Sequence, residues 1–107
     1  MTVRERAAEW LAHDPDPTTQ VELQALLDAN EDGELTERFS GPLTFGTAGL
    51  RGVLGAGESR MNTAVVRRTS AGLAAYLRKH VPDSATRGVV IGYDGRHQSD
   101  EFARDTA

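Results

Sequence analysis

The sequence predicts an α/β fold, in which a mixed β-sheet with flanking helices follows an acidic, α-helical N-terminal arm. Three observations lead to this fold class. The first 40 residues carry two capping-box patterns, each followed by apolar residues at helical spacing. Beyond them, extended and helical segments alternate in the order strand, helix, strand, helix. The run 88–93 is rich in β-branched residues, which is typical of a strand buried on both faces.

The arm divides into helices at its capping boxes and its prolines. Capping boxes occupy residues 2–5 and 19–22, and each predicts the start of a helix. The segment 13–17 contains two prolines, which lack a backbone N–H and restrict the preceding residue, so it should form a rigid connector. The expected helices cover residues 3–12, 20–29 and, as one further turn, 34–39. The acidic residues of the arm are interpreted as a solvated face.

A change in composition at residues 40–42 separates two predicted domains, the arm (1–40) and an α/β domain (41–107). The elements expected after this break are an extended run over 43–45, a helix capped by Asn62 and closing at His80, a strand over 88–93 and a helix opened by Ser99. Parallel strands joined by a helix take a right-handed crossover, and such sheets bind ligands in the loops beyond the carboxyl ends of their strands.

Composition excludes several functions. The chain has no cysteine, so it offers no disulfide, no thiolate zinc site and no cysteine nucleophile. No apolar run is long enough to cross a bilayer, and the N-terminus resembles no targeting signal, which predicts a cytoplasmic protein. The net charge of −4 divides unevenly: residues 1–39 carry three arginines and ten acids, or −7, whereas the remainder carries +3. The basic half favours an anionic ligand but is too weakly charged for nucleic acid.

The glycine-rich stretch 45–52 lies in this basic half and has the composition of an anion-binding loop. Its three glycines allow backbone N–H groups to converge on one point, and Thr47 adds a hydroxyl. Arg51 adds a planar set of donors that suits phosphate or carboxylate oxygens. The alternative is a glycine-rich turn beside an exposed arginine.

A second candidate phosphate contact, Arg96, follows the predicted strand 88–93. We expect Arg51 and Arg96 to converge on one patch, because both follow glycine-rich turns at the ends of adjoining strands. Asp94 is expected to brace its turn or pair with an arginine. It and Glu58 are isolated beside arginines, so no metal ligand is predicted in this chain.

Taken together, these motifs resemble a known enzyme superfamily. The motifs are Phe45-Gly46-Thr47-Ala48-Gly49-Leu50-Arg51-Gly52, Ser59-Arg60-Met61-Asn62 with its helix, and Val89-Val90-Ile91-Gly92-Tyr93-Asp94-Gly95-Arg96. In order and spacing they are similar to the beginning of domain 1 of the α-D-phosphohexomutases, the phosphoglucomutase and phosphomannomutase superfamily. The resemblance covers about residues 40–107. The acidic arm resembles the lead of the phosphoglucomutase and phosphopentomutase-like branch.

The resemblance implies a four-domain enzyme that moves a phosphoryl group between C1 and C6 of a hexose through a phosphoserine and a bisphosphate intermediate. It further implies Mg²⁺, hexose 1,6-bisphosphate as activator, a sugar-phosphate substrate and contacts with the other domains of the same enzyme. By position, Thr47 and Arg51 would line the active-site cleft, with Arg96 supporting the same anionic centre.

The motif that carries the phosphorylated serine is absent up to Ala107, as are the family's magnesium, sugar and terminal phosphate loops. No catalytic residue is therefore assigned, and the 107-residue chain alone is expected to turn over no sugar phosphate and to hold no Mg²⁺ tightly.

Two other classes of function stay open: a free-standing module that binds an anion or a partner without catalysis, and a structural element in which the arm oligomerises. The sequence downstream of Ala107 would distinguish these two classes from the enzyme, because the enzyme requires the phosphoserine motif there. The identity of the sugar and the oligomeric state are left undetermined.

Overall fold

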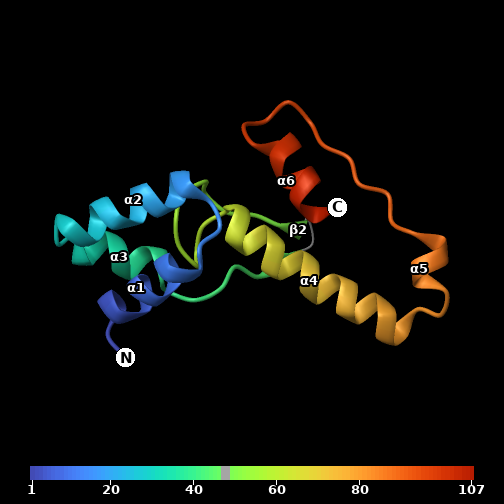
Figure 1. The fold of residues 1–107 in the computed structure, drawn as a ribbon, viewed down its shortest axis with the longest axis horizontal. Helices are drawn as coiled ribbons and strands as arrows, with labels where there is room; N and C mark the ends of the chain where they lie inside the picture. The colour runs from blue at the N-terminus through green and yellow to red at the C-terminus, as the bar shows by residue number, and fades with distance from the viewer. Residues whose placement is uncertain (47–48) are drawn as a thin grey trace. The chain divides into compact units, whose positions relative to one another are not determined.

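The computed structural model describes residues 1–46 and 49–107, and the chain forms two compact units, Met1–Val65 and Val66–Ala107 (Figure 1). The described elements are α1 (Val3–His13), α2 (Pro17–Asp28), α3 (Asp32–Arg38), β1 (Phe45–Gly46), β2 (Gly49–Leu50), α4 (Thr63–His80), α5 (Ser84–Arg87) and α6 (Ser99–Thr106). Among these helices, none has both the length and the apolar character that a membrane crossing requires.

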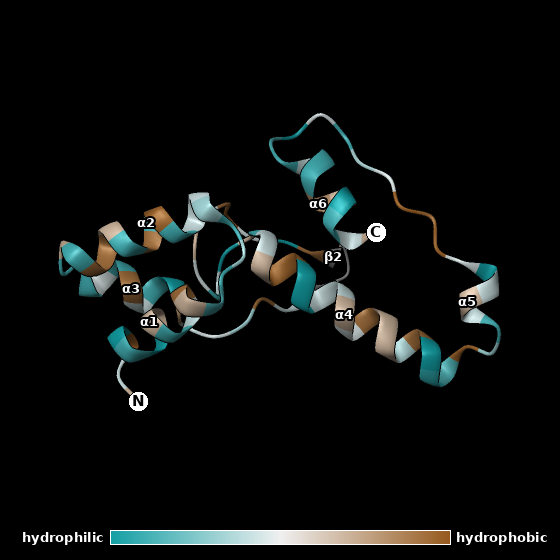
Figure 2. Cartoon of the chain, in the orientation of Figure 1, coloured by the Kyte–Doolittle hydropathy of each residue, from teal (hydrophilic) through white to brown (hydrophobic). Residues whose placement is uncertain are grey.

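Helices α1, α2 and α3 pack together around the core of the first unit (Figure 1). In Figure 2, apolar residues recur at intervals along these helices and are separated by polar ones, as an amphipathic helix requires. The buried core consists of Ala7, Leu23, Leu35, Phe39 and Ala56. The ring of Trp10 meets Phe39 edge-on, with 6.0 Å between ring centroids. Ala56 comes from outside the arm, so the arm completes its core with a residue of the following loop.

The predicted first helix is confirmed, and the start of the second is corrected. Thr2 caps α1 by accepting a hydrogen bond from the Glu5 N–H at 3.1 Å. Helix α2 begins at Pro17, earlier than expected, because proline is tolerated at the first helical position and Asp16 supplies the cap. The capping box predicted at 19–22 is wrong: the Thr19 hydroxyl is buried and donates to the Asp14 carboxylate at 2.5 Å.

The two short strands of the glycine-rich stretch pair with each other. Strand β1 runs antiparallel to β2, with Phe45 opposite Leu50 and Gly46 opposite Gly49. This pairing holds residues 45–46 beside residues 49–50, and Arg51 follows β2 directly. Thr47, a predicted site residue, lies outside the described residues.

The predicted long helix and last helix are both confirmed, as α4, most of which lies in the second unit, and α6. They are joined by a bond from the Arg67 Nη2 to the Asp105 carboxylate at 2.9 Å and by a hydroxyl contact between Ser70 and Thr106. The short helix α5 was not predicted from the sequence. It occupies part of the connection that follows α4.

The predicted mixed β-sheet is wrong. In the described part of the chain, strands occur only as the two-residue pair β1 and β2, and the segment 88–93 forms none. Its side chains lie open to solvent, with Val90 99% exposed. A strand needs a neighbour for its backbone groups, and the extended residues 53–54 pair with Met61 instead. The β-branched residues of 88–93 favour a strand, but their composition does not specify a neighbouring strand with which to pair.

Candidate anion-binding site

Arg51 is exposed, and the backbone is hydrogen-bonded on both sides of it, in strand β2 before it and at Val53 after it. Strand β2 ends immediately before it. Two residues after it, the carbonyl oxygen of Val53 accepts the Met61 N–H at 2.7 Å. Among the residues that the structure describes, no carboxylate pairs with Arg51. Its donors are thus available to an anion from solution, and the site residue predicted at position 51 is sterically accessible.

The residue after Arg51 is held by a close backbone approach. A Cβ atom placed on Gly52 would lie 2.7 Å from Cδ1 of Leu43, well inside van der Waals contact. Glycine at this position therefore allows the chain to pass over the Leu43 side chain. The Leu43 side chain could move aside, so the Val53 hydrogen bond is the firmer restraint on the C-terminal side of Arg51.

The loop 55–61 is organised by one buried side chain, that of Asn62, which is 1% exposed. Its Nδ2 donates to the carbonyl oxygens of Gly55 and Gly57, both at 2.8 Å. Its Oδ1 accepts from the Val65 N–H at 2.9 Å, which confirms the predicted cap of α4. One amide group therefore joins the loop to the start of the helix.

Side chains of the arm also bind this loop. Arg38 and Glu22 form an ion pair and each bonds the backbone of Ala56, and Arg6 contacts the Glu58 carboxylate at 3.0 Å. The interpretation of the acids as a solvated face missed these contacts. The partners in these contacts are at least 16 residues apart in the sequence, so no local pattern indicated them.

The second predicted contact, Arg96, lies in the second unit and is 84% exposed. Its Nε donates to the Asp94 carboxylate at 2.8 Å, and its backbone N–H donates to the same carboxylate at 3.0 Å. The expected pairing of Asp94 with an arginine is confirmed. Because Arg51 belongs to the first unit and Arg96 to the second, the convergence of the two arginines stays a prediction.

Hydrogen bonding lowers the pKa of Asp94. The largest cause is the backbone N–H of Arg96, with the Ser99 hydroxyl and the Arg96 guanidinium adding to it, whereas desolvation acts in the opposite sense. A lowered folded-state pKa means that the stability contributed by these bonds is present above the unfolded-state pKa. It is lost as the pH falls through the folded-state pKa.

We therefore expect NMR titration of the Asp94 carboxyl carbon to give a pKa below that of an unstructured aspartate. The substitution Arg96→Gln should raise this pKa only part of the way, because the backbone N–H remains in place. A pKa at or above the unstructured value would contradict the turn geometry. A full return to that value in Arg96→Gln would instead make the guanidinium the main cause.

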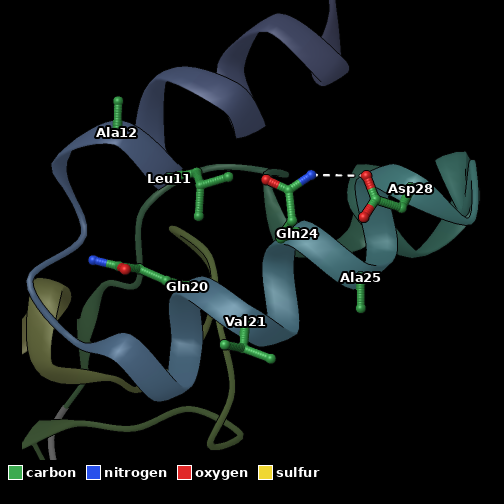
Figure 3. Close-up of a pocket in the computed structure, with 7 residues that line it drawn as sticks. All are labelled: Leu11, Ala12, Gln20, Val21, Gln24, Ala25 and Asp28. Carbon is green, nitrogen blue, oxygen red and sulfur yellow. Dashed lines mark hydrogen bonds between the residues drawn. The ribbon is translucent and has the colours of Figure 1, made fainter.

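A hollow of about 650 Å³ lies between α1 and α2 (Figure 3). Its lining residues are Leu11, Ala12, Gln20, Val21, Gln24, Ala25 and Asp28. In Figure 3 the Gln24 amide points to the Asp28 carboxylate, and their hydrogen bond measures 2.8 Å. With no cation among its lining residues, this hollow lacks the charged donors that hold an anion most strongly.

The described residues do not fit a divalent metal. They contain no group of three or more histidine, aspartate or glutamate side chains placed to share one ion. Two carboxylates lie close in sequence to the predicted site residues, those of Glu58 and Asp94, and each is bonded to an arginine. Mg²⁺ is usually held by one or two carboxylates together with water, and these two already bond arginines, so no step of the chemistry is assigned to a metal held by them.

Residues 42–107 match the phosphoglucomutase/phosphomannomutase family in its alpha/beta/alpha domain I. The chain belongs to this family. The superfamily predicted from the motifs in residues 45–96 is thereby confirmed.

Individual relatives extend the similarity into the arm. The chain is 44% identical over 105 residues to a probable phosphoribomutase of Schizosaccharomyces pombe, covering 98% of this chain and 18% of the relative. It is 40% identical over 92 residues to a phosphopentomutase of Mus musculus, covering 86% and 15%. It is 39% identical over 90 residues to a glucose 1,6-bisphosphate synthase of Homo sapiens, covering 84% and 14%. The chain thus spans less than a fifth of these relatives. No solved structure matches it significantly.

Proposed function

We propose that the full-length protein carrying this chain moves a phosphoryl group between C1 and C6 of a hexose phosphate, through a phosphoserine and a bisphosphate intermediate. The 107 residues contribute phosphate-contacting loops to that enzyme. The observation that carries the proposal is the family match across 42–107, which includes an exposed arginine, Arg51, on a segment anchored at both ends.

The proposed role of Arg51 follows from the chemistry of phosphoryl transfer. Charge spreads over the phosphoryl oxygens in the transition state, so catalysis relies on positioning and on electrostatic stabilisation. A guanidinium offers paired donors to two such oxygens. Arg51 would bind the transferring phosphate, Thr47 would add a hydroxyl contact, and Arg96 would support the same anionic centre.

The proposal also includes a metal ion, Mg²⁺, and an activator, hexose 1,6-bisphosphate, neither of which is bound by residues assigned in this chain. Mg²⁺ would neutralise charge on the phosphoryl oxygens when bound, with ligands outside this chain. Hexose 1,6-bisphosphate would phosphorylate the serine and so start the cycle. A cytoplasmic location is part of the same proposal.

A second candidate substrate is a pentose phosphate, with transfer between C1 and C5. The names of two of the relatives, phosphoribomutase and phosphopentomutase, favour it. The reaction type and the role of Arg51 would be unchanged, since both substrates present the same phosphate to the protein.

Turnover by the full-length protein tests both candidates. Glucose 1-phosphate, mannose 1-phosphate and ribose 1-phosphate would each be supplied with Mg²⁺ and a matching bisphosphate, and ³¹P NMR would follow the change in phosphate position. We expect conversion, with a hexose phosphate as the fastest substrate. A higher kcat/KM for ribose 1-phosphate would establish the second candidate. Phosphate binding without conversion of any substrate would favour a non-catalytic module.

A further inference from the structure

Two arm residues of opposite charge bind both backbone groups of one loop residue, Ala56. The carboxylate of Glu22, from α2, accepts the Ala56 N–H at 2.8 Å. The Nη1 of Arg38, the last residue of α3, donates to the Ala56 carbonyl oxygen at 3.1 Å and also to the Glu22 carboxylate. We call these three residues the Ala56 clamp. It joins two helices of the arm to a point 18 residues beyond the arm's last helix.

The clamp is partly shielded from solvent, because the Glu22 side chain is 37% exposed. Ala56 is fully buried, and the Arg38 side chain is only 16% exposed. A second carboxylate, that of Glu34, accepts from the Arg38 Nε at 3.0 Å and fixes the orientation of the guanidinium. Partly buried ion pairs of this kind add little net stability compared with apolar packing. Their directional bonds do, however, define the position of the groups that they bind.

The backbones of the arm and the loop also approach each other beside the clamp. The Ser59 N–H donates to the Arg38 carbonyl oxygen at 2.8 Å. Gly57 has a φ of +114°, and a Cβ atom placed on it would lie 2.9 Å from that same carbonyl oxygen. Glycine is required there both by its backbone conformation and by the lack of space. Arg38 therefore contacts the loop through its main chain as well as through its guanidinium.

A short chain of hydrogen bonds leads from the clamp to Arg51. The Gly55 N–H, next to Ala56, donates to the Met61 carbonyl oxygen at 3.2 Å. The Met61 N–H in turn donates to Val53 at 2.7 Å, two residues after Arg51. Each link lies within the first unit. Displacing Ala56 would thus loosen the anchor on the C-terminal side of Arg51.

We propose that Glu22 and Arg38 are positioning residues, which use Ala56 to hold the Arg51 segment in place for an anion. This inference rests on the proposed function only in taking Arg51 as the phosphate contact. The acidic arm is then a support for the phosphate-contacting loop. Neither Glu22 nor Arg38 needs to touch the substrate to affect it.

The test compares Arg38→Met with Arg4→Met by NMR on the chain without ligand. Arg4 is a matched control, because it bonds a carboxylate (Asp32) and a backbone carbonyl (Leu27), each at 3.0 Å, within the arm. In Arg38→Met, amide exchange at Ala56 and Met61 should become at least about tenfold faster, and the amide signals of residues 51–53 should shift. In Arg4→Met these amides should stay as in the wild type.

Faster exchange confined to Ala56, or no change at any of these amides, would overturn the proposal. If Arg38→Met speeds exchange at Leu23 to the same degree, the core has opened. In that case the same amide measurements are made on the milder variant Glu22→Gln, which keeps the size of the side chain, and their result decides whether the proposal holds.

Kinetics of the full-length protein separate this inference from the proposed function. If Glu22 acts through Arg51, Glu22→Gln should lower kcat/KM in the wild type but have little further effect in an Arg51→Ala background. Equal losses in both backgrounds would overturn the inference. A protein without turnover whose amides at 51–53 still respond to Arg38→Met would contradict the proposed function and leave the positioning role in place.

Discussion

Substituting Arg51 with alanine in the full-length protein is expected to lower kcat/KM for the sugar phosphate by roughly 30- to 900-fold. This range corresponds to a loss on the order of 2–4 kcal/mol of transition-state stabilisation, the usual effect of removing one charged donor from a developing oxyanion. Arg51 has no carboxylate partner among the described residues, so the loss would come from the contact to the phosphoryl group.

Arg104→Ala is the matched control for this measurement. Its guanidinium is 70% exposed and bonds Asp100 one turn away, so its removal should change stability by a few tenths of a kcal/mol. Steady-state kinetics with the best substrate, at fixed ionic strength, would compare the two variants. An Arg51→Ala enzyme with wild-type kcat/KM would reject the phosphate contact.

The second large effect is expected in the free energy of unfolding of Asn62→Ala. The substitution leaves two carbonyl oxygens of the loop, those of Gly55 and Gly57, without their donor and removes the cap of α4. Buried acceptors that lose a partner and helices that lose a cap each cost about 1 kcal/mol or more, so a total of roughly 2–4 kcal/mol is expected. Urea unfolding followed by circular dichroism would measure it.

Two further variants separate the contributions of Asn62. Asn62→Asp keeps the acceptor for the Val65 N–H but has no donor for the loop carbonyls, so it should be destabilised nearly as much as the alanine variant. Thr2→Ala removes one exposed cap bond at the start of α1 and should cost only about 0.5–1 kcal/mol. An Asn62→Asp protein as stable as the wild type would show that the bonds to the loop contribute little.

Local sequence signals predicted the helices well, because a helix satisfies its own backbone and its ends depend on nearby side chains. Thr2 and Asn62 were recognised as caps, and the helices that follow them begin as expected. The start of α2 was misplaced because Thr19 is bonded to Asp14, a contact that a capping pattern cannot distinguish from a true cap.

The candidate site was predicted in part. Arg51 lies exposed within the glycine-rich stretch 45–52, and Asp94 pairs with Arg96 as expected. The phosphate-binding roles of Thr47, Arg51 and Arg96 stay predictions. The clamp around Ala56 was not foreseen, because its members come from positions 22, 38 and 56. Nothing in the local pattern of any one of them indicates the other two.

From the sequence alone, four of the six described helices could be predicted in outline and a fifth, α2, with a late start, together with the family of the motifs and the arginines that are candidates for a phosphate. These properties depend on residues close together in the chain, whose spacing can be read directly. The three-dimensional structure was needed to show that residues 88–93 join no sheet and that the arm binds the loop 55–61. Both outcomes depend on which distant segment supplies a hydrogen-bonding partner, and composition carries no information about that choice.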